Sequence, residues 1–301
     1  MAYPVIDKPY GLKPVNLIGG QVFAGSTRMV PIAAGYGTNI FYGDLVQLTA
    51  TGTAIITSTS VPSTSQAAQA AVPGTVGVFL GTEFTYPSGP LFGKMRQQYW
   101  PASTAAQDAV AYVADDPDQL FKVAVIAQSG ATNANTGTTI GYMSQAFVGT
   151  NVYYVAGNGG STSTGDSFAG VSGNTPGASN GAGNVRKDNS TTAPFRVVDL
   201  IDETAVYVNT ALTASASSTS LTVASTAGVY PGMQVVIPAA TVGGTAGLYT
   251  YVTAVTSSTA VTVSTSITAA NGSAVGFVGY PEVIVKLNFG YHSYYNATQI
   301  A

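Results

Sequence analysis

The chain has 301 residues, of which 10 are basic and 13 acidic, so that 8% are charged and the net charge at pH 7 is -3. A soluble domain usually carries about 25% charged residues, and because no basic cluster longer than Arg186-Lys187 is present, we expect no nucleic-acid partner. Zero cysteines and a single histidine exclude disulfides, thiolate nucleophiles and metal sites built on two histidines.

The first fifteen residues are expected to form an extended arm. Proline recurs at positions 4, 9 and 14, which prevents a helix and favours extended backbone. The opening residues show no basic region followed by an apolar stretch, and no run approaches the roughly 18 apolar residues of a membrane span, so we expect no signal peptide and a cytoplasmic product without a membrane partner. The arm needs a surface to cover, either its own sheet or a neighbour's edge. Its candidate partner contacts are Tyr3, Pro4, Ile6, Tyr10, Leu12 and Pro14.

Alternation of apolar and polar residues predicts strands at 76–80, 109–113, 120–125, 195–200 and 283–289. Only residues 65–71 and 103–109, each preceded or opened by serine and rich in alanine, are typical of short helices. Glycine, proline, asparagine and serine separate the predicted strands at short intervals. The sequence therefore predicts a mainly β fold, with a β-sandwich or β-barrel main domain over residues 16–208 and 282–301. Residues 157–184, with nine glycines, are expected to form a long surface loop.

Residues 209–281 contain no lysine, arginine, aspartate or glutamate, whereas the predicted strands on either side carry charges. This shift predicts a small β-sandwich module, immunoglobulin-like in size, inserted between two strands of the main domain. Residues 218–226 are echoed forty positions later by residues 258–266. Such an echo arises either from internal duplication or by chance in a sequence rich in serine and threonine.

Chemistry-bearing motifs are sparse. The only acidic cluster supplies weak candidate metal ligands, Asp115, Asp116 and Asp118, although a turn between strands is the simpler interpretation. Residues 177–181 match a nucleophile-elbow pattern but lack the strand and helix that it requires. The single histidine, His292, sits in an aromatic tail and is expected to be packed. With no phosphate-binding loop, we expect no enzyme and no cofactor.

Aromatic residues gather in two places and are candidate interface anchors, because they bury much area at low entropic cost. For most of them a place in the core is the alternative interpretation. The first group surrounds prolines in the middle of the chain, and the second lies in the C-terminal tail. The candidate contacts are Tyr86, Phe92, Tyr99 and Trp100 in the first group and Tyr291, Tyr294 and Tyr295 in the second.

Five segments together resemble decoration or cement proteins from tailed-bacteriophage capsids, the first three as the N-terminal signature of that family and the last two as further matches. They are Tyr10-Gly11-Leu12-Lys13-Pro14-Val15, Gly25-Ser26-Thr27-Arg28, Ile40-Phe41-Tyr42-Gly43-Asp44-Leu45-Val46, the stretch 112–121 and the stretch 130–135. The resemblance covers roughly residues 3–208 and the closing strand. The chain departs from the family pattern in the charge-free module and in its aromatic tail.

The resemblance implies a β-rich virion subunit on the capsid exterior, commonly a homotrimer, that ties neighbouring major capsid subunits together. Its partners would be the major capsid protein and copies of itself. We expect the arm to cross a subunit boundary, so that deletion of residues 2–14 leaves a folded subunit that no longer binds. The alternatives are a carbohydrate-binding tail or adhesin protein and a self-assembling surface-layer protein.

Overall fold

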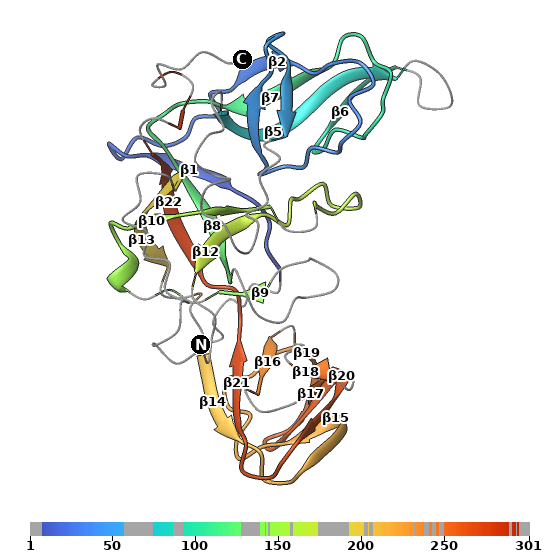
Figure 1. The fold of residues 1–301 in the computed structure, drawn as a ribbon, viewed down its shortest axis with the longest axis vertical. Coiled ribbons are helices and arrows are strands. Elements are labelled where there is room, and N and C mark those ends of the chain that lie inside the picture. Colours follow the sequence, from blue (N-terminus) through green and yellow to red (C-terminus); the bar gives the residue numbers. More distant parts are fainter. Residues whose placement is uncertain are drawn as a thin grey trace.

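The computed structural model describes residues 8–56, 75–86, 93–127, 139–141, 143, 145–156, 159–173, 193–201, 204, 207–231, 233–237, 241–242, 245–246, 250–288, 291–292 and 294. Over these ranges the regular structure is almost entirely β and is organised in three sheets, which follow one another along the long axis of the molecule (Figure 1). The predicted mainly β fold is confirmed. We call the three sheets I, II and III.

Sheet I takes its strands from the first 114 residues of the chain and lies at one end of the molecule (Figure 1). Its strands are β2 (Arg28–Pro31), β3 (Leu45–Leu48), β4 (Ala54–Ile56), β5 (Thr75–Tyr86), β6 (Gly93–Gln97) and β7 (Val110–Ala114). Their inward-facing apolar side chains surround Trp100, which is fully buried and meets Phe84 edge-on at 5.2 Å between ring centroids. This cluster is the core of sheet I.

Sheet II occupies the middle of the molecule and combines strands from distant parts of the chain. Its strands are β1 (Lys13–Leu17), β8 (Gln119–Ala127), β9 (Thr139–Ile140), β10 (Asn151–Val152), β11 (Tyr154–Val155), β12 (Gly170–Gly173), β13 (Phe195–Ile201) and β22 (Glu282–Leu287). The short 3-10 helix η2 (Gln145–Phe147) precedes β10. Strand β12 runs parallel to β8, and the other described pairings are antiparallel.

Sheet III curves around a core of its own at the other end of the molecule (Figure 1). Its strands are β14 (Tyr207–Ala211), β15 (Ala216–Thr222), β16 (Gln234–Val236), β17 (Thr241–Val242), β18 (Thr245–Ala246), β19 (Thr250–Ser257), β20 (Ala260–Ala269) and β21 (Ala274–Val278). In the described part of the chain these strands pair only with one another. The two echoed segments fall on β15 and β20, which are antiparallel neighbours.

The predicted strands are confirmed within β5, β7, β8, β13 and β22. The helix expected over residues 103–109 is wrong, because hydrogen bonds to the distant segment around Tyr36 hold it in an irregular loop. The Ser103 N–H donates to the Tyr36 carbonyl at 2.7 Å, and Ser103 itself has a φ of 60°. The other expected helix, residues 65–71, lies outside the described residues.

The long loop expected over residues 157–184 is partly wrong, since β12 forms a buried strand within it. Gly170 lies so close to β8 that a Cβ atom there would come within 2.6 Å of the Ala124 carbonyl oxygen. A four-residue strand flanked by glycines has too little alternation to be recognised from sequence. Gly170 is explained by the close approach of the β12 and β8 backbones rather than by a flexible loop.

Candidate functional site

Four of the five segments that carry the family resemblance converge where sheet I meets sheet II. The Leu12 N–H donates to the Gly43 carbonyl at 2.9 Å, and a Cβ atom built on Gly43 would lie 2.8 Å from the Gly11 Cα atom. Strand β1 pairs with β8, and β2 pairs with β7. Segments that are far apart in sequence thus form one structural unit, which we call the junction.

Asp44 is the polar centre of the junction and is 1% exposed. Its carboxylate accepts hydrogen bonds from the Phe41 N–H at 2.7 Å, from the Ser167 hydroxyl at 2.5 Å and from the Tyr154 hydroxyl. Burial raises the pKa of Asp44 to about 7, and the three hydrogen bonds oppose that rise. Because Tyr154 and Ser167 belong to the part of the chain around sheet II, Asp44 links the two sheets.

A second buried carboxylate, Glu282, anchors the start of β22. It accepts a hydrogen bond from the Tyr10 hydroxyl and pairs with Lys122 Nζ at 3.1 Å, while its N–H donates to Thr204 Oγ1 at 2.8 Å. Burial, together with the neighbouring Glu282 carboxylate, raises the pKa of Tyr10. Tyr10 therefore holds the N-terminal segment to its own subunit.

The expectation that the arm offers partner contacts is wrong for Tyr10 and Leu12, whereas for Pro14, which is half-buried on β1, it stays a prediction. Leu12 is fully buried in the core of sheet II, Tyr10 is 9% exposed, and Pro14 pairs with Phe121 across β1 and β8. Of the two surfaces that the arm was expected to cover, its own sheet or a neighbour's edge, these residues cover their own sheet. The remaining arm candidates, Tyr3, Pro4 and Ile6, lie outside the described residues.

The aromatic candidates divide between core and surface. Trp100 is wrong as a contact residue because it is fully buried, and Tyr86 and Tyr99 are half-buried against Phe84 and Phe41. Tyr291 packs against the core of sheet II. Tyr294 is 52% exposed and is available for contacts. Phe92 and Tyr295 lie outside the described residues.

The three weak metal candidates do not converge on a common point. Asp115 accepts a hydrogen bond from the Tyr294 hydroxyl, Asp116 accepts one from the Asp118 N–H at 2.8 Å, and Asp118 pairs with Lys286 at 2.6 Å. Among the described residues, no group of three or more histidine, aspartate or glutamate side chains is close enough to hold a metal ion. The cluster forms the turn between β7 and β8.

His292 is 2% exposed and contacts the Tyr294 ring, and its Nδ1 accepts the Tyr294 N–H at 3.2 Å. Burial lowers the pKa of His292. The expected packed histidine is confirmed. The nucleophile-elbow pattern at residues 177–181 lies outside the described residues.

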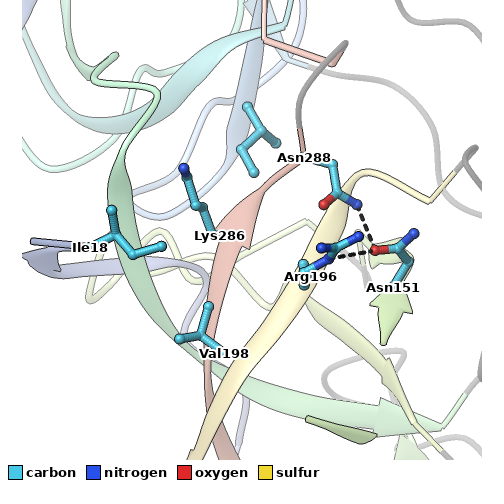
Figure 2. Close-up of a pocket in the computed structure, with 7 residues that line it drawn as sticks. Ile18, Asn151, Arg196, Val198, Lys286 and Asn288 are labelled. Carbon is cyan, nitrogen blue, oxygen red and sulfur yellow. Dashed lines mark hydrogen bonds between the residues drawn. The ribbon is translucent and has the colours of Figure 1, made fainter. Parts of the chain in front are cut away.

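A shallow hollow of about 380 Å³ opens on the outer face of sheet II (Figure 2). Strands β13 and β22 send alternate side chains to opposite faces, so that Phe195 and Val285 enter the core while Arg196 and Lys286 face outward. Sequence reasoning recognised both strands but assigned no role to their outer face. The hollow is lined by Ile18, Asn151, Arg196, Val198, Lys286, Leu287 and Asn288.

Three large apolar side chains are exposed in the N-terminal part of the chain. Val22 is 78%, Met29 64% and Ile18 54% exposed, and all three follow closely on β1 or belong to β2. In sheet III, Tyr251 and Val255 are 41% and 37% exposed. Scattered apolar residues are ordinary on a surface, but Ile18 borders the hollow.

Comparison of the chain with protein-family models, curated proteins and solved structures found no match. Within the described ranges, the structure contains no helix that is sufficiently long and apolar to span a membrane.

Proposed function

We propose that this chain is a structural virion protein that binds the outside of a phage capsid and ties neighbouring major capsid subunits together. The observation that carries the proposal is the junction, because the residues of the resemblance meet there instead of being scattered over the fold. Gly11 and Gly43, which come from different segments, have backbones in direct contact. Short sequence matches that contact one another in the fold are harder to explain by chance than isolated short matches.

The surface chemistry supports the same proposal. A subunit that binds once to a repeating protein shell gains from a broad surface and from apolar contact residues, and needs no deep pocket. The exposed Val22, Met29 and Ile18 supply such residues on the sheets that the resemblance covers. A low content of charge suits a fixed contact better than a partner that must be steered from solution. We propose a homotrimer as the binding form.

The test is the composition and reassembly of the particle that contains this chain. Quantitative mass spectrometry of purified particles should find the chain in a copy number comparable to that of the major capsid protein. Purified protein added to shells that lack it should co-sediment with them until the sites are filled. A copy number typical of a tail component, or no co-sedimentation with shells, would contradict the proposal.

The truncation that tests the arm must be shorter than the sequence suggests. Deletion of residues 2–14 removes Tyr10 and Leu12 from the subunit's own interior, so we expect this variant to be destabilised itself and its binding to be uninformative about the arm. Deletion of residues 2–7 leaves both residues in place. If the arm crosses a subunit boundary, this shorter variant should fold normally but bind shells less tightly than the full chain.

A carbohydrate-binding role is the second candidate, because sheet III presents an exposed tyrosine on a face without charge. Tyr251 stands on β19 beside exposed hydroxyl side chains such as Thr253, and aromatic faces together with hydroxyl groups suit uncharged sugars. Binding to a glycan array that is lost in Tyr251→Ala would favour this role. An absence of glycan binding, with co-sedimentation on shells, would favour the capsid role.

A further inference from the structure

The hollow on sheet II contains an unusual pairing of like charges. Arg196 and Lys286 are direct cross-strand partners on β13 and β22, and both face outward. Like charges that lie opposite each other across two strands destabilise a sheet. Departures from such local rules are most often found at functional positions, so the groups that compensate the two cations decide what this face can bind.

Only one of the two cations has a carboxylate partner in the described structure. Lys286 Nζ lies 2.6 Å from Asp118 Oδ1. Arg196 forms no ion pair with a described residue, and its Nε donates a hydrogen bond to Asn151 Oδ1 at 3.3 Å. Among the described residues, the hollow therefore carries about one positive charge that no carboxylate compensates, on a side chain that is exposed.

One hydrogen bond restrains the guanidinium of Arg196, and Asn288 orients the asparagine that accepts it. Asn288 Nδ2 donates to the same Asn151 oxygen at 3.1 Å and to the Ala193 carbonyl at 2.7 Å. Figure 2 shows the three side chains joined by these hydrogen bonds at the rim of the hollow. With Nε engaged, the other guanidinium N–H groups remain as donors for an incoming group. An arginine fixed in this way loses less entropy when it binds.

The rest of the hollow is apolar. Val198 and Leu287 line it, and the half-exposed Ile18 closes one side. A volume of about 380 Å³ lies at the lower end of the range for ligand sites. The space suits one acidic side chain and an adjacent apolar side chain of an extended peptide. A singly charged carboxylate also fits the charge balance better than a phosphate dianion, because Asp118 lies nearby.

We propose that this hollow binds an extended acidic segment of the major capsid protein, with an aspartate or glutamate carboxylate on Arg196 and an apolar neighbour against Val198 and Ile18. The choice of the capsid protein rests on the function proposed above. The chemistry of the ligand, a carboxylate next to an apolar side chain, rests on the hollow itself. Arginine binds carboxylates through two parallel hydrogen bonds, which gives both affinity and orientation.

The first experiment compares two arginine variants in the shell-binding assay. Arg196→Gln should weaken co-sedimentation with shells at least about tenfold, as expected for loss of a charge-assisted pair. Arg96→Gln is the matched control, because Arg96 is also exposed but lies on β6 of sheet I and pairs with Glu83 at 3.2 Å. Unchanged circular dichroism and Trp100 fluorescence would show that both variants fold.

The outcomes separate the two proposals. If the wild-type protein binds shells and Arg196→Gln binds equally well, the docking proposal is wrong while the capsid function stands. If both arginine variants weaken binding equally, the effect is general electrostatics, and the docking proposal is again wrong. If the wild-type protein does not bind shells at all, the capsid function fails.

A second experiment tests the ligand chemistry without any shell. The peptide acetyl-Val-Asp-Val-amide should shift the NMR signals of the Arg196 Nε–H and the Asn288 side-chain amide, and the same peptide with asparagine should not. Equal shifts from both peptides, or no shift at the solubility limit of the aspartate peptide, would overturn the proposal. A response to inorganic phosphate alone would also overturn it and would identify a phosphate site instead.

Discussion

Replacement of Gly43 by alanine should destabilise the protein strongly, because Gly43 is the closest contact of the junction. Its φ of 91° lies in the left-handed region, which costs a residue with a Cβ atom roughly 1–2 kcal/mol. A Cβ atom there would also lie 2.8 Å from Gly11 Cα and from the Leu12 nitrogen. Backbone cannot move aside as a flexible side chain does, and forced overpacking costs about 1–3 kcal/mol more.

The two contributions together predict a loss of about 2–5 kcal/mol in the free energy of unfolding for Gly43→Ala. Gly52→Ala is the matched control, since Gly52 has a φ of 77° in a turn but no atom within 4 Å of the Cβ position. The control should therefore lose only the backbone contribution, about 1–2 kcal/mol. The difference between the two variants measures the contact between the segments.

The assay is urea unfolding followed by the fluorescence of Trp100, the single tryptophan, which is buried in the core of sheet I. The midpoint should fall further for Gly43→Ala than for Gly52→Ala, with little change in the slope of the transition. Equal midpoints for the two variants would refute the reasoning, because the contact with Gly11 would then contribute nothing to stability.

Two further predictions follow from buried side chains. Because burial raises the folded-state pKa of Asp44 from 3.8 to about 7, the folded protein holds a proton that the unfolded chain has lost between these values. This group's stabilising contribution is therefore complete below about pH 4 and is lost as the pH rises through 7. Asp44→Asn should remove that part of the pH dependence of urea unfolding, and identical profiles for variant and wild type would contradict the assignment. Phe277→Ala, in the core of sheet III, should destabilise sheet III by about 3–5 kcal/mol while leaving the Trp100 transition unchanged. A matching shift of the Trp100 midpoint would instead show that sheets I and III unfold together.

The sequence was most informative where its patterns are local. Alternating residues such as those of β8 and β22 predict strands because, over residues 119–123 and 283–287, one side of each strand is buried and the other is half-buried. The charge-free stretch 209–281 coincides closely with the strands of sheet III, Tyr207–Val278. These strands fold around a hydrophobic core of their own, which needs few charged residues. The short strand β12 was missed because its four residues carry no periodic signal.

The candidate sites were harder to predict, because burial depends on distant partners. Tyr10, Leu12 and Trp100 have the composition of contact residues, but the fold places them inside the subunit. The sequence does not show that Glu282, 272 positions later, meets the Tyr10 hydroxyl. The hollow was missed for a related reason: Arg196 and Lys286 are 90 positions apart and become neighbours only when β13 pairs with β22.

From its sequence alone, the chain is defined as a mainly β protein with a charge-poor module near its C-terminus, because period-two patterns and composition act over a few residues at a time. Only the tertiary structure decides that the N-terminal segment covers its own sheet, that Gly11 meets Gly43, and that one arginine is left beside a lysine without a described carboxylate partner. These features arise from long-range strand pairing, whose register no local pattern specifies.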